Sequence, residues 1–259
     1  MKSITGVIVP LLTPRNLSDL PHLLDHVIHG GVSAVIILGT NGETLKLDQK
    51  KRIEVIDKAV KHLQNRVPMI IGISAATIAE ALELTHISQD VGAFASFVIP
   101  HFWGGDGVQV IEELLASSTN NLIFYNYPAL TAGRFLPIEL ARRFACEERI
   151  LGIKDSSGDL EYFDKLLKTK KHSNFKIYYG REQNLPEVFE KGIDGIVPGC
   201  ANLDPRLASQ VWLKKGEGLW PEWETLRSKI KEAGSGNYIL GLKVSLKELG
   251  LLSDAGLWG

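Results

Sequence analysis

Residues 152–158 read Gly-Ile-Lys-Asp-Ser-Ser-Gly and follow the apolar pair Ile150-Leu151. The pattern predicts a short buried strand that ends in a turn, with Lys154 as its last inward-pointing side chain. A buried ammonium group is costly to desolvate. It needs a carboxylate partner, a stem that reaches solvent, or a pKa low enough for the amine to be neutral. A neutral amine can attack a ketone and form an iminium, which draws electrons from a neighbouring carbon–carbon bond. For this stretch alone, the alternative is an exposed lysine at the strand end, where most lysines lie.

Apolar runs of strand length alternate with helical patterns along the rest of the chain, with a cycle of roughly 25 to 30 residues. The predicted strands are 4–10, 34–38, 67–73, 93–99, 122–125, 150–154, 176–179 and 195–197. The predicted helices between them include 18–29, with Ser18 as its cap, 48–63, 78–90, one that starts near 108, and 137–146. Eight apolar strands separated by helices favour an α/β fold, the closed parallel (β/α)8 TIM barrel. An open doubly wound sheet usually has a glycine-rich phosphate loop after its first strand, and Thr13-Pro14-Arg15-Asn16 is not one.

The pattern assigns the barrel to residues 1–216 and a short C-terminal helical extension to residues 217–259. Two further helices, over 221–232 and 238–249, are expected in the extension. No shift in composition marks a second domain within the barrel.

Composition narrows the class of protein. The chain has 259 residues, 44% of them hydrophobic, and its 29 basic residues nearly cancel its 30 acidic residues. This balance argues against a nucleic-acid partner, and no apolar run approaches the roughly 18 residues of a membrane-spanning helix. The N-terminus has no apolar signal core, and the two cysteines, Cys146 and Cys200, have no zinc spacing and are more simply free thiols than a disulfide. We expect a cytoplasmic protein with neither a membrane partner nor a metal.

The barrel changes the interpretation of Lys154, because active sites of this fold lie at the C-terminal ends of the strands. Tyr125 ends the preceding strand, and Thr40 and Asn41 follow the second strand. A tyrosine hydroxyl beside an amine can shuttle protons, and a threonine can relay them. The glycines that flank Thr40 and Asn41 leave backbone N–H groups open to an anion such as a carboxylate. Lys154, Tyr125 and Thr40 are therefore the predicted catalytic residues.

Three motifs in register resemble one known family. They are Gly39-Thr40-Asn41-Gly42-Glu43, Tyr125-Asn126-Tyr127-Pro128 and Gly152-Ile153-Lys154-Asp155. Together they are similar to the dihydrodipicolinate synthase and N-acetylneuraminate lyase superfamily of pyruvate-dependent class I aldolases. The resemblance covers most of the chain, from Gly6 to about Asn202.

The resemblance implies a role for each matching residue. Lys154 would form a Schiff base with the ketone of pyruvate or another 2-oxo acid, and Tyr125 would transfer protons. The carboxylate of the substrate would be held by Gly39, Thr40 and Asn41, and the pocket would also be lined by Gly180 and Val197. No metal or organic cofactor is implied, because the imine itself is the electron sink. The family also implies a homo-oligomer, either a tetramer or a dimer.

Two departures bear on the substrate. Members that make dihydrodipicolinate have an arginine at the position of Leu130 and a second tyrosine at the position of Phe102, and both losses count against lysine biosynthesis. Residues 125–131 look more like lyases of 2-keto-3-deoxy sugar acids or sialic acid, and residues 40–43 look like 4-hydroxy-2-oxoglutarate aldolases. The expected reaction is reversible cleavage of a 2-keto-3-deoxy sugar acid or a 4-hydroxy-2-oxo acid to pyruvate and an aldehyde.

Three alternatives stay open. The first is dihydrodipicolinate synthase, which condenses pyruvate with aspartate semialdehyde. The second is a non-catalytic barrel that binds a 2-oxo acid. The third is a phosphate-binding isomerase barrel that uses Gly195 and Gly199, but it explains neither Lys154 nor Tyr125.

Four more polar residues lie near the predicted site. His101 follows the fourth strand and is expected either to touch the substrate or to pack its loop. Arg181 follows the seventh strand and could bind a distal carboxylate or form a structural ion pair. Glu43 could act as a base or fix its loop by accepting backbone hydrogen bonds, and Asp155 is expected to orient the turn after Lys154.

Overall fold

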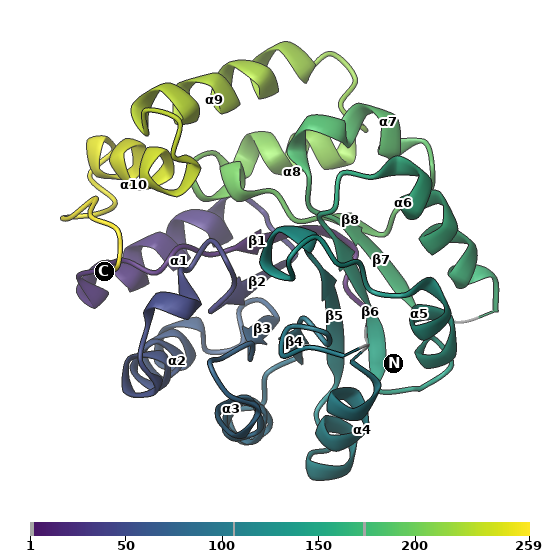
Figure 1. Cartoon of the computed structure of the whole chain (residues 1–259). Helices are drawn as coiled ribbons and strands as arrows, with labels where there is room; N and C mark the ends of the chain where they lie inside the picture. The colour runs from purple at the N-terminus through teal and green to yellow at the C-terminus, as the bar shows by residue number, and fades with distance from the viewer. Residues whose placement is uncertain (1–2, 106, 173–174) are drawn as a thin grey trace. The chain divides into compact units, whose positions relative to one another are not determined.

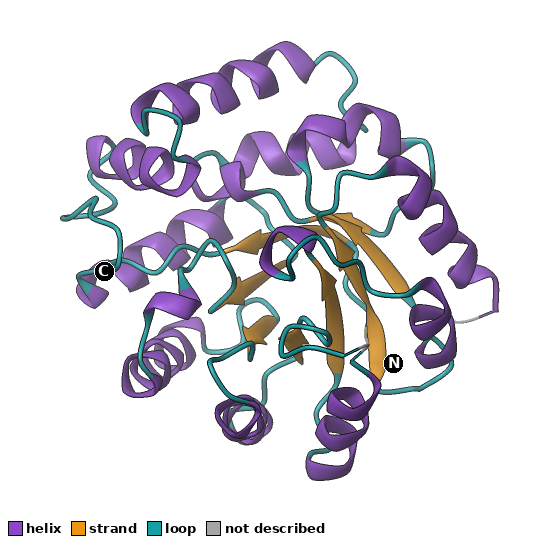
Figure 2. Cartoon of the chain, viewed as in Figure 1, coloured by secondary structure: helices purple, strands orange, loops and turns teal. Residues whose placement is uncertain are grey.

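The computed structural model describes residues 3–105, 107–172 and 175–259. Its strands follow one another in sequence order around a closed barrel, with helices between them (Figure 1; strands are orange in Figure 2). The strands are β1 (Gly6–Pro10), β2 (Ala34–Ile37), β3 (Met69–Gly72), β4 (Ala95–Val98), β5 (Leu122–Asn126), β6 (Ile150–Asp155), β7 (Lys176–Tyr179) and β8 (Gly195–Ile196). The predicted (β/α)8 barrel is confirmed.

The α-helices are α1 (Leu20–His29), α2 (Gln49–Leu63), α3 (Ile78–Asp90), α4 (Val108–Ser117), α5 (Ile138–Phe144), α6 (Leu160–Leu167), α7 (Leu185–Phe189), α8 (Pro205–Leu213), α9 (Trp220–Ala233) and α10 (Tyr238–Glu248). Short 3-10 helices are η1 (Leu17–Asp19), η2 (Thr44–Lys46), η3 (Pro128–Leu130), η4 (Lys168–His172), η5 (Glu182–Asn184) and η6 (Gly199–Asn202). The expected C-terminal helices are present as α9 and α10.

The start of the first helix differs from the prediction. Ser18 does not cap it: a 3-10 turn, η1, comes first, and the side chain of Asn16 accepts a hydrogen bond from the Ser18 backbone N–H at 3.1 Å. α1 then begins at Leu20, with Pro21 in its first turn, where the missing N–H of proline costs nothing. The prediction of Ser18 as the cap was wrong because Asn16 is an equally good cap two residues earlier.

The strands are buried along almost their whole length, as strands covered on both faces must be. Gly152 shows how closely they pack. A Cβ at this position would lie 2.2 Å from the backbone oxygen of Lys176, so only glycine lets β6 run directly beside β7. The glycine of the Gly-Ile-Lys-Asp stretch thus fixes the strand that carries Lys154.

The chain divides into two compact units, and each is described by itself. One contains the N-terminal residues up to Thr5 together with Ile70–Val197; the other contains Gly6–Met69 and Pro198–Gly259. In the second unit, α9 and α10 pack closely, because a Cβ at Gly241 would lie 1.8 Å from the Ile230 oxygen. The predicted division between residues 216 and 217 stays a prediction.

Two further observations concern membrane-spanning helices and disulfides. Within the described residues, no helix is both long and apolar enough to cross a membrane. Cys146 is exposed, Cys200 is buried, and neither forms a disulfide, as the sequence predicts.

Candidate active site

Lys154 lies at the end of β6 with 5% of its surface exposed. Burial lowers the pKa of its amine from 10.5 to about 7, although the nearby carboxylates of Glu182 and Asp155 act in the opposite direction. The cost of removing the charged amine from water outweighs the attraction of both carboxylates. A large share of this amine is therefore neutral near pH 7, and a neutral amine is a nucleophile.

Aromatic rings form the wall beside this amine. Tyr125 pairs with Lys154 in the register of β5 and β6, and the lysine Nζ lies 4.5 Å from the centre of the tyrosine ring. Phe97 stacks on Tyr125 from β4, with 4.9 Å between ring centres, and Tyr127 stacks at 5.4 Å. The apolar faces of these rings exclude water from the amine, which is the physical origin of its lowered pKa.

Gly180 leaves room for the lysine side chain. A Cβ at Gly180 would lie 2.4 Å from Cε of Lys154 and 2.3 Å from Oγ of Ser156. Gly180 thus has a steric role beside Lys154, while its predicted place in the lining of the substrate pocket stays a prediction. Ser156 was missed by the sequence analysis: its hydroxyl is buried next to Lys154 and has no hydrogen-bond partner among the residues that the structure describes.

Asp155 holds the turn after Lys154, as predicted. Its carboxylate accepts hydrogen bonds from the Asn126 amide at 2.6 Å and from the Ser157 hydroxyl at 2.9 Å. The oxygen of the Asn126 side chain accepts a further bond from the Leu136 N–H at 2.9 Å. Burial raises the pKa of Asp155 to about 6, against these hydrogen bonds. The network joins the ends of β5 and β6 and keeps Lys154 beside Tyr125.

His101 is buried in the loop after β4, where it links to the loop after β5. Its Nε2 lies 3.1 Å from the backbone oxygen of Arg134, and the Arg134 guanidinium donates to the oxygen of His101 at 3.2 Å. Burial lowers the pKa of the imidazole. A neutral ring that donates from Nε2 leaves Nδ1 as an acceptor, and no described residue donates a hydrogen bond to this buried atom. His101 therefore packs its loop, while contact with substrate stays a prediction.

The remaining predicted residues of this unit occupy different environments. Val197 is buried, and its N–H donates to the Tyr179 oxygen at 2.8 Å. Arg181 is exposed, and its guanidinium lies beside Gly158, where a Cβ would be 3.2 Å from Nε. The structure brings Lys154, Tyr125 and Gly180 together, and it places Arg181 at the surface of the turn after β6.

The second unit contains the turn after β2. Gly39 is buried, and Thr40 and Asn41 are half-buried and accessible. The backbone N–H of Glu43 closes the turn by donating to the Thr40 oxygen at 3.0 Å. A Cβ at Gly199 would lie 2.5 Å from the Asn41 side-chain nitrogen, so this glycine makes room for the amide.

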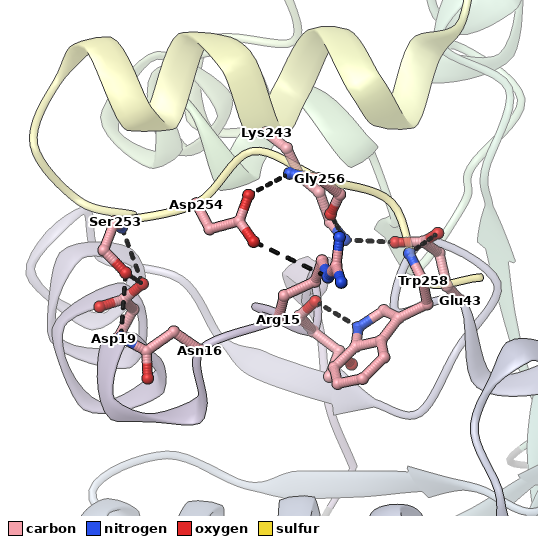
Figure 3. Close-up of polar contacts among 10 residues, drawn as sticks. Arg15, Asn16, Asp19, Glu43, Lys243, Ser253, Asp254, Gly256 and Trp258 are labelled. Atoms are coloured by element: carbon pink, nitrogen blue, oxygen red, sulfur yellow. Dashed lines mark hydrogen bonds and ion pairs between the residues drawn. The ribbon is translucent and has the colours of Figure 1, made fainter.

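Glu43 fixes this turn through contacts with the C-terminal part of the chain (Figure 3). One carboxylate oxygen pairs with the Lys243 ammonium, and the other accepts a hydrogen bond from the Trp258 backbone N–H at 3.1 Å. The interpretation of Glu43 as a residue that holds its loop is supported, since both oxygens are engaged. No sequence signal pointed to Lys243, which lies 200 residues away.

In residues 3–105, 107–172 and 175–259, no group of three or more histidine, cysteine, aspartate or glutamate side chains could hold a metal ion.

A buried lysine that is neutral near pH 7, set against a tyrosine ring at the end of a barrel strand, is the arrangement of enzymes that use an amine as a nucleophile. Residues 2–256 match the model of the Dihydrodipicolinate synthetase family. The chain belongs to this family, and the expected class, a carbon–carbon lyase, is confirmed.

Three similar proteins illustrate the range of the family. The 4-hydroxy-tetrahydrodipicolinate synthase of Pseudomonas syringae is 28% identical over 97% of this chain and 90% of its own length. YagE of Escherichia coli K12, provisionally named a 2-dehydro-3-deoxy-D-gluconate aldolase, is 29% identical over 79% of this chain and 72% of its own. The solved structure of dihydrodipicolinate synthase from Acinetobacter baumannii, complexed with pyruvate, has a TM-score of 0.84 and 26% identity over 98% of this chain and 92% of its own.

Proposed function

We propose that this protein is a class I aldolase that cleaves a 2-keto-3-deoxy sugar acid or a 4-hydroxy-2-oxo acid to pyruvate and an aldehyde. The observation that carries the proposal is Lys154, a buried amine with a pKa of about 7 beside the ring of Tyr125. The pyruvate complex of the Acinetobacter baumannii relative supports a 2-oxo acid as the ligand. A non-catalytic binding barrel would have no need for a neutral amine at this place.

The proposed reaction proceeds through an imine. The Lys154 amine adds to the C2 ketone of the substrate, and the carbinolamine loses water to give an iminium. The C4 hydroxyl then loses its proton and becomes an aldehyde, while the electron pair of the C3–C4 bond moves into an enamine. A proton returned to C3 and water added to C2 release pyruvate and the free amine. Tyr125 is the proposed carrier of these protons.

The substrate carboxylate is assigned by resemblance to the turn after β2. We propose that Thr40 and Asn41 bind it, with Gly39 opening the backbone N–H groups. Their half-buried, accessible position is consistent with this role. Gly180 and Val197 are proposed to line the pocket, and Arg181 and His101 to bind the distal part of the substrate.

Dihydrodipicolinate synthase is the second candidate, because the Pseudomonas syringae relative has that activity in its name. The sequence features against it are Leu130 and Phe102. Phe102 packs edge-on against Trp103 at 5.4 Å between ring centres, and a phenyl ring cannot relay a proton. We therefore favour sugar-acid cleavage over condensation with aspartate semialdehyde.

A pair of assays tests the choice. Pyruvate release is measured by a coupled lactate dehydrogenase reaction on a panel of 2-keto-3-deoxy sugar acids and 4-hydroxy-2-oxo acids. Condensation of pyruvate with aspartate semialdehyde is measured in parallel, and Lys154→Ala is the blank for both. We expect turnover in the first assay; turnover in the second alone would assign the protein to lysine biosynthesis.

We further propose that the protein works in the cytoplasm as a homo-oligomer, either a dimer or a tetramer. The free thiols of Cys146 and Cys200 support a reducing compartment. Analytical ultracentrifugation tests the oligomer, and a monomer at micromolar concentration would contradict it.

A further inference from the structure

Residues 253–259, which lie beyond α10, contact two turns that are far away in sequence (Figure 3). We call these residues the tail segment. The first turn, residues 11–16, follows β1; the second, residues 39–47, follows β2 and contains the proposed carboxylate-binding pair. These are contacts within one compact unit of the chain.

Trp258 touches both turns. Its backbone N–H donates to the Glu43 carboxylate at 3.1 Å, and its indole N–H donates to the Thr13 oxygen at 3.0 Å. The two turns are also packed against each other, because a Cβ at Gly42 would lie 2.9 Å from the Thr13 hydroxyl. Trp258 therefore links the two turns, with one hydrogen bond to each.

Lys243 supports these contacts from α10. Its side chain is completely buried, it pairs with Glu43, and its ammonium donates to the Gly256 oxygen at 3.1 Å. One ammonium thus holds the Glu43 carboxylate and the backbone of the tail segment together. Because an uncompensated charge is very unfavourable in such a place, the pair strongly favours this one arrangement.

The near end of the tail segment is anchored separately. The N–H and hydroxyl of Ser253 donate to one carboxylate oxygen of Asp19 at 2.8 and 2.7 Å, and the Asn16 amide donates to the Ser253 hydroxyl at 2.9 Å. With Ser253 fixed, Trp258 needs to order only a few residues to reach its partners, which lowers the entropic cost of its contacts.

The backbone of Glu43 explains why the β2 turn needs such support. Its φ angle is +53°, in the left-handed region that residues other than glycine avoid. A strained conformation of this kind persists only where the surroundings hold it. The Glu43 N–H also donates to the Thr40 oxygen, so the conformation of Glu43 sets the shape of the turn around Asn41.

We infer that Trp258 and Lys243 are positioning residues for the reaction. They hold Glu43 and thereby keep the β2 turn in the shape in which Thr40 and Asn41 bind the carboxylate of the 2-oxo acid. This inference rests on the proposed function, and it adds a role for a segment more than 200 residues away from that turn.

Truncation tests the inference more cleanly than Lys243→Met, which would leave the Glu43 carboxylate without its ammonium partner and could unfold the protein. One variant ends at Leu257 and loses both contacts of Trp258. Trp258→Phe keeps the backbone bond to Glu43 but loses the indole bond to Thr13. A variant that ends at Trp258 is the matched control, since it lacks only Gly259, around which a Cβ would meet nothing within 4 Å.

Two readouts are taken on each protein after circular dichroism has verified the barrel. The first is the pyruvate concentration that gives half-maximal trapping by borohydride, followed by intact mass. The second is hydrogen exchange at the amides of residues 43–47, several of which are bonded within the β2 turn, with α2 as the internal control.

In the variant that ends at Leu257, we expect the half-maximal pyruvate concentration to rise about tenfold. The trapped yield at saturating pyruvate should equal that of the wild type, because Lys154 is untouched. Exchange in the β2 turn should be faster, α2 should be unchanged, Trp258→Phe should be intermediate, and the control should match the wild type.

Each other outcome has a definite meaning. Unchanged exchange in the β2 turn would show that the tail segment does not hold it, and faster exchange with unchanged pyruvate binding would show that the turn does not position the carboxylate; either overturns the inference. No trapping in the wild type at any pyruvate concentration would instead refute the proposed function, and the positioning role with it.

Discussion

At the scale of single residues, the decisive quantity is the pKa of Lys154. Burial beside aromatic rings lowers this pKa to about 7, and the carboxylates of Glu182 and Asp155 prevent it from falling further. Near pH 7 these opposing effects leave the Lys154 amine partly neutral, so it can attack a ketone and can also be reprotonated during imine chemistry.

The rate of imine formation should follow this pKa. Below the pKa the neutral fraction, and hence the rate, should rise about tenfold per pH unit, and it should level off above about 7. Glu182→Gln should move the profile to lower pH, because the Glu182 charge raises the pKa. The measurement is the initial rate of cyanoborohydride trapping with pyruvate against pH. A midpoint near the ordinary lysine value of 10.5 would contradict the burial argument.

The same shift predicts a trend in stability. Between pH of about 7 and 10.5 the unfolded chain binds a proton at Lys154 that the folded chain does not, so the free energy of unfolding should rise with pH across this window. Lys154→Met should weaken that trend and be more stable than the wild type near pH 7, since it removes a costly buried amine. Urea denaturation at several pH values measures both effects, and a wild type that loses stability as Lys154 deprotonates would oppose the prediction.

Gly180→Ala should disable the site without unfolding the barrel. The added methyl would lie 2.4 Å from Cε of Lys154, and the lysine must move because the backbone cannot. We expect the trapping rate to fall roughly 100-fold, the effect of misplacing a reacting group by about 1 Å. Gly192→Ala is the control: it strains a left-handed position by about 1 kcal/mol but meets nothing within 4 Å, so trapping should be unchanged. Equal effects of the two substitutions would rule out the steric argument.

At the scale of secondary-structure elements, the sequence predicts most strands and helices of the barrel. It predicts less well where a helix begins and which side chains connect neighbouring strands. The apolar strands and their alternation with helices are confirmed because burial on both faces leaves a plain hydrophobic pattern. The prediction that Ser18 caps the first helix was wrong, because Asn16 and Ser18 are both favourable capping residues. Their capping propensities alone do not show which of the two is used. The hydrogen bond between the side chains of Asn126 and Asp155 joins two strands, and no local sequence pattern predicts it.

The side chain of Asn126 should contribute strongly to stability, because it connects the ends of β5 and β6. It is fully buried and bonds both Asp155 and the Leu136 N–H. Asn126→Ala therefore takes the side-chain acceptor from the Leu136 N–H and removes one of the hydrogen bonds that the buried Asp155 carboxylate accepts. We expect a loss of about 2 to 4 kcal/mol in the free energy of unfolding. Asn121→Ala is the matched control, with a half-buried side chain that donates to the Phe94 oxygen, and it should lose about 1 kcal/mol. If urea denaturation showed the same loss in the free energy of unfolding for Asn126→Ala and Asn121→Ala, the Asn126 network would have no special role in stability.

At the scale of the whole molecule, the family and the class of enzyme could be predicted from three motifs, whereas contacts between distant segments could not. Glu43 and Lys243 are 200 residues apart, and the sequence shows only an ordinary glutamate and an ordinary lysine. Ser156 was missed for a related reason: that its buried hydroxyl has no hydrogen-bond partner among the described residues becomes visible only in the folded structure. The part of the site that would bind the aldehyde half of the substrate is formed by loops, whose conformation depends on such distant contacts. For this reason the sequence alone does not decide between sugar-acid cleavage and condensation with aspartate semialdehyde.

Catalysis should not depend on a metal. The proposed electron sink is the Lys154 iminium, so dialysis against EDTA should leave the rate of pyruvate release unchanged. The check is the coupled assay before and after chelation, with zinc or magnesium added back. A loss of activity that a divalent cation restores would replace the imine mechanism with metal-assisted chemistry.

The central claim is that Lys154 forms the imine, and reductive trapping tests it most directly. Wild type, Lys154→Ala and the control Lys176→Ala, which changes the lysine at the start of β7, are treated with pyruvate and borohydride and weighed intact. We predict one pyruvate adduct on the wild type and on Lys176→Ala, and none on Lys154→Ala. An adduct that persists in Lys154→Ala, or no adduct on the wild type, would contradict the account.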